Sequence, residues 1–288
     1  MSKVKSTGAG ARLVWRKLSP AKWEDVWQER LGWLGQRLVI FVLKGLKTLR
    51  LEVHQLTRAE ADLLTKEFGG TVRAARALTK RDLEPVARPP LRVRGKLVVV
   101  GTEKERAAAA KDGVPCVMIP ASLAFGTGEH ATTATCLRIL ADVAASLRGR
   151  EWDALDIGTG SGILALAARH FGARKVEAGD FDATAVRLAK ENAAANGVRG
   201  VVVKRFDVLK WKPTRRWPVV LANVYGPILI EAAPQIASAV EHGGALILSG
   251  ILREQADDVI AAFKKQRCRF ERITRRGKWV TCLARVTS

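Results

Sequence analysis

The second half of the chain alternates short apolar runs with longer amphipathic segments. The short runs predict strands at 152–157, 175–180, 201–207, 217–223 and 244–249. The amphipathic segments predict helices near 163–172, 183–196, 227–241 and 253–266, and two last strands are expected at 268–275 and 279–286. Strands that alternate with helices favour a doubly wound, Rossmann-like α/β sheet of seven strands, which binds ligands at the carboxyl ends of its parallel strands.

The first quarter of the chain has a different rhythm. Strand-like alternation begins at Arg12, and Ser19-Pro20 has the residue types that open a helix, which we expect to run to about Leu31. Two apolar runs and a helix that Thr57 would cap follow, with strands at 38–43, 48–54 and 71–73. The order βαββαβ predicts a small α+β domain of the ferredoxin-like type.

The change of rhythm suggests where the domains begin and end. Residues 1–10 are expected to be a disordered leader, because they are rich in Lys, Gly and Ser. We assign 11–75 to the ferredoxin-like domain, 76–119 to a connector and 120–288 to the α/β domain. Within the connector we expect one strand from Leu91 to Val100 and one short helix over 103–112.

Charge adds a statement about partners. The chain has 49 Lys+Arg against 28 Asp+Glu, a formal net charge of +21, and residues 1–110 carry +12 of it. Such an excess favours anionic partners, above all RNA, although a generally basic composition would explain it as well.

The remaining bulk features point to a cytoplasmic protein. The longest apolar stretch ends after six residues at Leu43, far short of the roughly 20 that cross a bilayer, so we expect no membrane contact. Four scattered cysteines form no C-x-x-C pair and have no histidine at metal-ligand spacing, so we expect reduced thiols and no metal site.

The first candidate site is a glycine loop that follows the strand at 152–157. It reads Asp156-Ile157-Gly158-Thr159-Gly160-Ser161-Gly162, and an apolar helix comes directly after it. Glycines allow a tight turn and close approach of a ligand to the backbone. The same segment also satisfies the dinucleotide pattern G-x-G-x-x-A. Asp156 favours S-adenosylmethionine instead, because a carboxylate there suits a cationic amino group and would repel a pyrophosphate.

Two further acids end the next two strands. Asp180 lies 18 residues after Gly162, where a carboxylate can accept both ribose hydroxyls. Asp207 could accept from the adenine amino group, although aspartate is also common in turns. Asp182 is interpreted as the N-cap of the following helix.

The fourth strand ends in Ala222-Asn223-Val224-Tyr225-Gly226-Pro227. The side-chain carbonyl of Asn223 could accept a hydrogen bond from an amine and aim its lone pair at the transferred methyl group. A strand-ending Asn that satisfies a turn is the simpler alternative. Tyr225, the only tyrosine of the chain, could wall the acceptor pocket or pack in the core.

A third segment precedes the α/β domain, and it reads Leu123-Ala124-Phe125-Gly126-Thr127-Gly128-Glu129-His130-Ala131-Thr132-Thr133. Its Gly-Thr-Gly turn could close over a bound cofactor, and we expect Phe125 and Thr133 to contact that cofactor. The two threonines open a helix that continues to Leu147. His130 is a possible base, but a lone histidine is more often structural.

These segments together resemble the bacterial family of ribosomal protein L11 methyltransferases. The resemblance rests on 123–133, on the glycine loop, on Gly179-Asp180-Phe181-Asp182, on Ala222-Asn223 and on Leu246-Ile247-Leu248-Ser249-Gly250-Ile251-Leu252. It covers about 120–260 strongly, and the first domain agrees in topology more than in sequence. Pro120-Ala121-Ser122 and Thr159 depart from the pattern of the family, which often has Asp-Pro-Gly and usually Cys at these places.

The resemblance implies a class I methyltransferase fold and a set of roles. Thr133, Gly158, Asp180 and Asn223 match positions that bind the cofactor, and Asn223 also matches the residue that orients the acceptor amine. The first domain would hold the substrate protein and swing on the connector. We therefore expect methyl transfer from S-adenosylmethionine to amino nitrogens of a ribosomal protein. L11 is the ribosomal protein that the resemblance favours, and contact with rRNA is possible.

Three other functions stay open from the sequence. The positive charge also fits an RNA base N-methyltransferase, although the run at Asn223 is not the Asn-Pro-Pro-Tyr type. A NAD-dependent oxidoreductase is disfavoured by Asp156. A non-catalytic ribosome-binding protein would not need a complete set of pocket residues. All of the expected pocket residues are present here, which disfavours that alternative.

Overall fold

The structure is a computed structural model that describes residues 13–20, 23–31, 34, 37–42, 48–74, 90–111, 113–120 and 131–287. The chain divides into two compact units, residues 1–87 and 88–288. Each unit has its own buried apolar core, and each is described by itself below.

The first unit is a four-stranded antiparallel sheet with two helices, as the βαββαβ pattern predicts. The elements are β1 (Leu13–Pro20), α1 (Glu24–Leu31), β2 (Leu38–Val42), β3 (Thr48–Leu56), α2 (Arg58–Phe68) and β4 (Thr71–Ala74), and the strand order is β2-β3-β1-β4. Trp15 is completely buried at the centre, where its indole N–H donates to the carbonyl of Gly69 at 2.8 Å. This order is that of the ferredoxin-like fold.

The two helices of this unit begin differently from one another. Thr57 caps α2 as expected, in a reciprocal capping box with Glu60. The expected cap at Ser19-Pro20 is wrong, because β1 continues through both residues and pairs them with Leu49 and Thr48. The Ser19 hydroxyl instead accepts a hydrogen bond from the indole of Trp27 at 2.7 Å, so it ties the strand to α1.

The second unit opens with a small sheet of order β5-β6-β7, formed by β5 (Leu91–Val93), β6 (Leu97–Val100) and β7 (Cys116–Met118). The helix α3 (Glu103–Lys111) connects β6 to β7. The expected single strand from 91 to 100 is a hairpin. Arg94 and Gly95 both have positive φ, 52° and 66°, which is the geometry of a tight hairpin turn. Val93, Leu97 and Val117 pack into the core of the unit, so this part of the expected connector is folded with the α/β domain.

The large sheet has seven strands in the order β10-β9-β8-β11-β12-β14-β13. Its elements are α4 (Ala131–Ser146), β8 (Ala154–Ile157), α5 (Ile163–His170), β9 (Val176–Asp180), α6 (Ala183–Ala195), β10 (Val201–Arg205), β11 (Trp217–Asn223), α7 (Gly226–Glu231), α8 (Ala233–Ser238), β12 (Val240–Leu252), η4 (Arg253–Gln255), α9 (Ala256–Lys265), β13 (Cys268–Arg276) and β14 (Trp279–Val286). Only the pairings of β14 with β12 and β13 are antiparallel within this sheet. The expected doubly wound α/β fold is confirmed.

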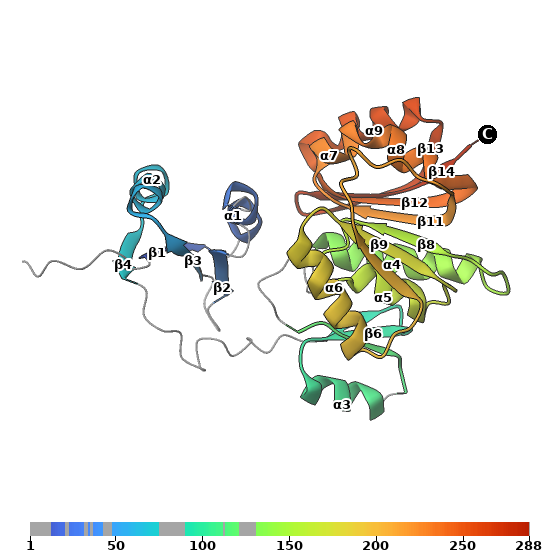
Figure 1. Ribbon diagram of the computed structural model, residues 1–288, viewed down its shortest axis with the longest axis horizontal. Coiled ribbons are helices and arrows are strands. Elements are labelled where there is room, and N and C mark those ends of the chain that lie inside the picture. The colour runs from blue at the N-terminus through green and yellow to red at the C-terminus, as the bar shows by residue number, and fades with distance from the viewer. Residues whose placement is uncertain are drawn as a thin grey trace, which may run out of the picture. The chain divides into compact units, whose positions relative to one another are not determined.

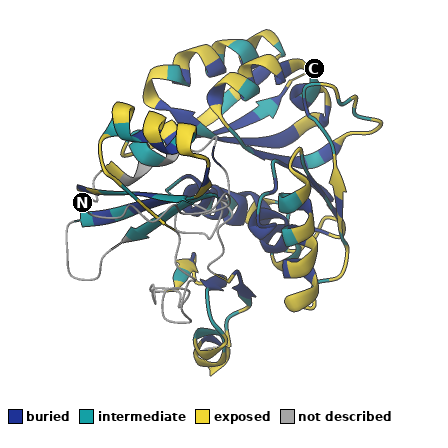
Figure 2. Cartoon of the chain, turned by 60° about the vertical axis from the view of Figure 1, so that its left-hand side comes forward, coloured by how far each residue is buried: buried dark blue, intermediate teal, exposed yellow. Residues whose placement is uncertain are grey.

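Helices cover both faces of this sheet (Figure 1). Helices α4, α5 and α6 pack on one face, and α7, α8 and α9 pack on the other. The central strands are buried on both sides, whereas the outer faces of the helices are exposed (Figure 2). The expected helix over 227–241 is two helices, because Pro234 lacks the N–H that a continuous helix would need and α8 restarts there.

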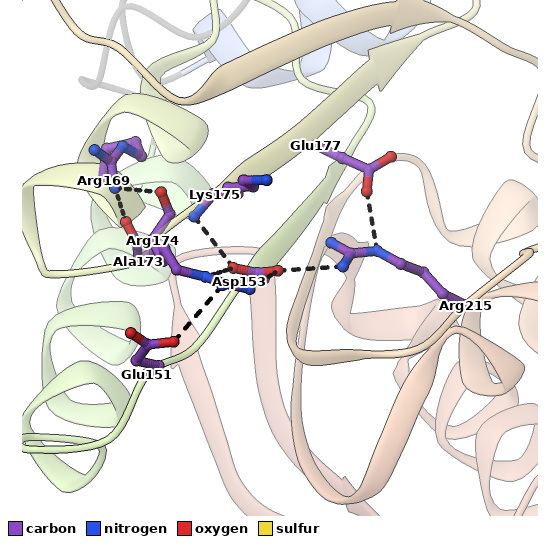
Figure 3. A network of polar contacts seen from close by, with 8 residues as sticks. All are labelled: Glu151, Asp153, Arg169, Ala173, Arg174, Lys175, Glu177 and Arg215. Atoms are coloured by element: carbon purple, nitrogen blue, oxygen red, sulfur yellow. Dashed lines mark hydrogen bonds and ion pairs between the residues drawn. The ribbon is translucent and has the colours of Figure 1, made fainter.

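Buried charge stabilises the edge of the sheet at which β8 and β9 begin (Figure 3). The Asp153 side chain, 7% exposed, accepts from the guanidinium of Arg174 and from that of Arg215, both at 3.2 Å, and from the backbone N–H of Lys175. Burial opposes ionisation of Asp153, but the hydrogen bonds from the two arginines outweigh it and hold its pKa below the usual value. This network lies at the amino ends of the strands, the edge opposite to the glycine loop.

Candidate functional site

The glycine loop joins β8 to α5 at the carboxyl edge of the sheet. Gly158, Gly160 and Gly162 all have positive φ, and Gly162 is the N-cap of α5 at φ 83°. A Cβ at Gly158 would lie 2.2 Å from Cγ1 of Val224, so this position has no room for a side chain. The backbone N–H groups of Gly158 and Thr159 both donate to the carbonyl of Gly179. The loop is therefore fixed between β9 and the segment after β11.

Asp156 lies under this loop and is completely buried. Its Oδ2 accepts from the hydroxyl of Thr159 at 2.7 Å and from the backbone N–H of Ala165 at 3.2 Å. Its Oδ1 is buried and has no hydrogen-bond partner among the described residues. Burial raises the pKa of Asp156 to about 7, and the charge of Asp180 adds to this while the two hydrogen bonds work against it. The carboxyl group thus changes its charge near neutral pH.

Asp180, at the end of β9, connects the glycine loop to α6. Its Oδ2 accepts from the backbone N–H of Gly160 at 3.0 Å, and its Oδ1 accepts from that of Asp182 at 3.0 Å. A carboxylate offers about four acceptor positions, so each oxygen can still accept a bond from a ligand. Asp182 caps α6 as expected, by accepting from the N–H of Thr184 at 2.8 Å.

Asn223 and Thr133, which are 90 residues apart in sequence, meet at the end of β11. The Nδ2 of Asn223 lies 3.5 Å from Oγ1 of Thr133 in the first turn of α4. The Oδ1 of Asn223 is buried without a hydrogen-bond partner among the described residues. A buried amide oxygen without a partner costs free energy, which a donor on a ligand would recover.

A polar row that the sequence did not indicate continues from Asn223 across the sheet. Ser249 is the neighbour of Asn223 in the β11–β12 ladder, and its hydroxyl shares a hydrogen bond of 2.7 Å with Thr281 on β14. Both hydroxyls are buried. Ser249 lies in a segment that carries the resemblance. The other signal for these two residues is a hydroxyl group inside an apolar strand, which is too common to interpret.

Asn192 is a second supporting residue that the sequence analysis missed. It lies on the buried side of α6 and donates from Nδ2 to the carbonyl of Ser161 at 2.8 Å. The bond fixes the far end of the glycine loop. An asparagine among alanines on the inner side of a helix was the available signal.

Two other expected site residues have more ordinary surroundings. The Oδ1 of Asp207 accepts from the backbone N–H of Leu209 at 3.0 Å, which is a turn-stabilising contact, and its Oδ2 lies 3.9 Å from Nζ of Lys210 in an ion pair. Tyr225 is 50% exposed just before α7, so core packing is the wrong interpretation for it. Phe125 and His130 lie outside the described residues.

The cysteines are free thiols in the structure. Burial raises the pKa of Cys136 and of Cys282 to about 12 and that of Cys268 to about 11, so all three are protonated at neutral pH. Over the described ranges, no helix has the length and apolar composition that crossing a membrane requires. In the same ranges, His, Cys, Asp and Glu side chains form no group of three or more that could hold a metal ion.

The chain matches a known protein family over most of its length. Residues 86–287 match the family model described as ribosomal protein L11 methyltransferase (PrmA). A relative of that name from Sorangium cellulosum is 43% identical over 174 residues, which are 60% of this chain and 54% of the relative. Another, from Rhizobium etli, is 40% identical over 192 residues, 65% of this chain and 64% of the relative. The matches thus span between about half and two thirds of the length of these curated relatives.

A solved structure shows the same fold. A ribosomal protein L11 methylase from Lactobacillus delbrueckii subsp. bulgaricus superposes with a TM-score of 0.61 at 26% sequence identity, and the match covers 69% of this chain and 99% of that chain.

Proposed function

The chain belongs to the ribosomal protein L11 methyltransferase family, and from this premise we propose that it transfers methyl groups from S-adenosylmethionine to amino nitrogens of a ribosomal protein. The acceptor that this proposal favours is L11, at Lys side chains or the N-terminal amine. Such an acceptor places the reaction in the cytoplasm. One observation carries the proposal: the buried Oδ1 of Asn223, which has no hydrogen-bond partner within the described part of the chain, lies at the carboxyl edge that also holds the glycine loop.

The residues around the loop fit S-adenosylmethionine. The glycines expose backbone where a ligand must approach closely. Two buried acceptors, Oδ1 of Asp156 and Oδ1 of Asn223, have no partner among the residues that the structure describes. Asp156 would accept from the cationic amino group, directly or through water, and Asp180 would accept from the ribose hydroxyls. The residues that would hold the cofactor are Thr133, Asp156, Gly158, Gly160, Gly162, Asp180, Asp207 and Asn223, together with Phe125.

The chemistry needs alignment more than acid–base catalysis. When bound, S-adenosylmethionine supplies an electrophilic methyl group whose sulfur leaves as a neutral thioether. Asn223 would accept a hydrogen bond from the acceptor amine through Oδ1, which aims the nitrogen lone pair at the methyl carbon. The amine must be neutral to attack, and an apolar pocket lowers the pKa of an amine by desolvation. The extra proton on the product nitrogen passes to solvent, so no strong base is required.

The first unit offers a surface for the acceptor protein. Its helices cover one face of the four-stranded sheet, and the opposite face carries Leu18, 61% exposed, beside Arg16 and Arg50. Both arginines pair with Glu52, at 2.6 Å and 3.0 Å. We assign protein recognition to this face, because it combines apolar contact area with orienting charges.

The test of this function is a transfer assay with labelled methyl groups. Tritiated S-adenosylmethionine, the full chain and unmethylated ribosomal components are incubated, and the label is resolved into individual proteins and rRNA. Label on L11 is the expected result. Label on rRNA alone would instead make the chain an RNA methyltransferase, and cofactor binding without any transfer would make it a non-catalytic ribosome-binding protein.

Cofactor binding should depend on pH through Asp156. Its pKa is raised to about 7 in the free protein, so the carboxyl group loses its charge as the pH falls through 7. A cationic ligand binds the charged form better. The affinity should therefore fall by up to about tenfold per pH unit below pH ~7 and level off above it. Calorimetric titration from pH ~5 to ~7, where the amino group of the ligand stays largely protonated, measures this fall.

The control for the pH profile is Asp156→Asn, which keeps the shape of the side chain and cannot ionise. This variant should bind more weakly at neutral pH and show a flat profile over the same range. If it kept the slope of the unmodified chain, some other group would be responsible, and Asp156 would have no part in binding the cation.

A further inference from the structure

Four arginines from three distant segments meet on the face of the large sheet that α4 covers. Arg94 comes from the turn between β5 and β6, Arg138 from α4, and Arg272 and Arg276 from β13. Of the acids in the described ranges, Asp142 lies among them: its Oδ2 accepts from Arg94 at 3.0 Å and from Arg272 at 2.8 Å. We call Arg94, Arg138, Arg272 and Arg276 the arginine cluster.

The strand register shows that the two β13 arginines share this face. Directly opposite residues of an antiparallel ladder point to the same side. Arg272 pairs with Leu283, whose side chain lies in the core under α4. Arg276 lies four residues further along β13, on the same side. Arg275 pairs with Val280, which belongs to the core under α7 to α9, so Arg275 lies on the opposite face.

Within the described ranges, the charge of the cluster is largely uncompensated. Asp142 gives one negative charge against four guanidinium groups there, and the one acceptor that Arg138 has among these residues is the backbone carbonyl of Ala134 at 3.2 Å. Burial lowers the pKa of Arg138, and the charges of Arg276 and Arg94 lower it further, so these guanidinium groups act on one another. About half of the side-chain surface of Arg94 and of Arg272 is exposed. The repulsion costs free energy that an anion seated among the arginines would recover.

We propose that the arginine cluster binds the phosphate backbone of RNA. Guanidinium groups match phosphate in charge and in planar, bidentate geometry. The choice of RNA rests on the proposed function, because a ribosomal protein acceptor lies next to rRNA in the ribosome. The cluster would then hold the RNA beside the acceptor.

The composition of the surface separates RNA from an acidic protein. Protein interfaces have an apolar centre with aromatic anchors, whereas nucleic-acid interfaces are more polar and more positively charged. Among the described residues, no exposed large hydrophobic side chain belongs to α4, to the 91–97 hairpin or to the α4 side of β13. The one on β13, Ile273, pairs with Cys282 on the opposite face.

The cluster lies close to the candidate active site along α4. Arg138 is five residues after Thr133 on the same helix, a rise of about 7.5 Å. RNA held by the cluster would therefore run along the flank of the helix whose first turn contacts Asn223. Contacts to phosphate position a nucleic acid without reading its bases. This arrangement would therefore orient an RNA-bound acceptor without any base-specific contact.

The test compares two neighbouring arginines that differ mainly in the face they occupy. Binding of a short fluorescein-labelled single-stranded RNA of mixed sequence is followed by anisotropy at several salt concentrations. Arg276→Gln should weaken binding by roughly fivefold at ~0.1 M salt and lower the slope of log K against log salt by about 0.7, the loss of one phosphate contact. Arg94→Gln combined with Arg276→Gln should weaken it on the order of thirtyfold.

Arg275→Gln is the matched control, because it removes the same charge from the same strand and should change binding by less than about twofold. Equal losses in Arg275→Gln and Arg276→Gln would overturn the proposal, since binding would then follow total charge. Polyglutamate that competes as well as RNA of the same charge would also overturn it, in favour of an acidic protein partner.

The RNA measurement is independent of methyl transfer, so the two proposals can fail separately. The Arg94→Gln/Arg276→Gln variant should methylate free L11 at the rate of the unmodified chain, because neither residue lies at the cofactor loop. If the unmodified chain transfers no methyl group at all, the proposed function fails while the RNA result stands. If RNA binding is unchanged in this variant, the cluster is not an RNA site, whatever the chain methylates.

Discussion

Replacing Asn223 with alanine should lower the turnover number by roughly a hundredfold or more and change the dissociation constant of S-adenosylmethionine by less than about threefold. The reason is the position of Oδ1, which is buried and has no partner among the described residues. An acceptor amine in that place would be oriented by this one oxygen, and loss of a single orienting group in a closed site commonly costs 10² to 10³ in rate, an order-of-magnitude expectation. Cofactor contacts from the glycine loop would remain.

The experiment is a comparison of kcat with cofactor affinity in the same variants. Thr133→Val is a useful companion, because the 3.5 Å contact to Nδ2 of Asn223 fixes the orientation of the amide without touching the acceptor. It should lower kcat by about tenfold, less than the loss in Asn223→Ala. If Asn223→Ala lost cofactor affinity and turnover by the same factor, Asn223 would act through cofactor binding alone and its orienting role would be wrong.

The architecture was predictable because it follows from a repeating local pattern. A buried parallel strand must be apolar, and its crossover must be an amphipathic helix, so the alternation after residue 150 dictates a doubly wound sheet. Local cues with a definite mechanism also held, such as the caps at Thr57 and Asp182. Ser19-Pro20 misled because pairing with β3 satisfies the backbone of Ser19 better than a helix start there would.

The glycine loop and the strand-ending residues could be predicted because they lie within one βαβ stretch of sequence or at defined strand ends. The structure brings Asn223 to Thr133. The resemblance assigned each of them separately to cofactor binding, and the periodicity could not show that the two meet. Ser249 and Thr281 meet only because β14 inserts between β12 and β13 in the sheet order. Nothing local in either strand encodes that neighbour relation.

The arginine cluster shows the same limit more sharply. Its members lie on a hairpin turn, a helix and an edge strand. Arg94 is 44 residues from Arg138 and 182 residues from Arg276 in the sequence. The composition indicated an excess of positive charge. Only the register of β13 with β14 separates Arg276, which belongs to the cluster, from its neighbour Arg275, which does not.

Replacing Asp180 with alanine should raise the dissociation constant of S-adenosylmethionine by roughly a hundredfold or more. Two hydrogen bonds from ribose hydroxyls to a charged group contribute about 1.5 to 3 kcal/mol each. The same change also frees the backbone N–H of Gly160, which Oδ2 now accepts at 3.0 Å, so the glycine loop loses a contact that holds its shape. The lost ribose bonds act on the bound state, whereas the lost loop contact makes the free protein less ordered for binding. Equilibrium binding by calorimetry measures their sum.

Asp182→Ala is the matched control for this prediction, because it removes a carboxylate two positions away on the same turn. Asp182 accepts from the N–H of Thr184 and caps α6, so its loss should lower the free energy of unfolding by about 1 kcal/mol and leave cofactor affinity within about twofold. Asp180→Asn should fall between the two, because it keeps one oxygen acceptor but no charge. If Asp180→Ala and Asp182→Ala weakened binding equally, the effect would come from disturbing the start of α6, and the carboxylate of Asp180 would not be the group that binds the ribose.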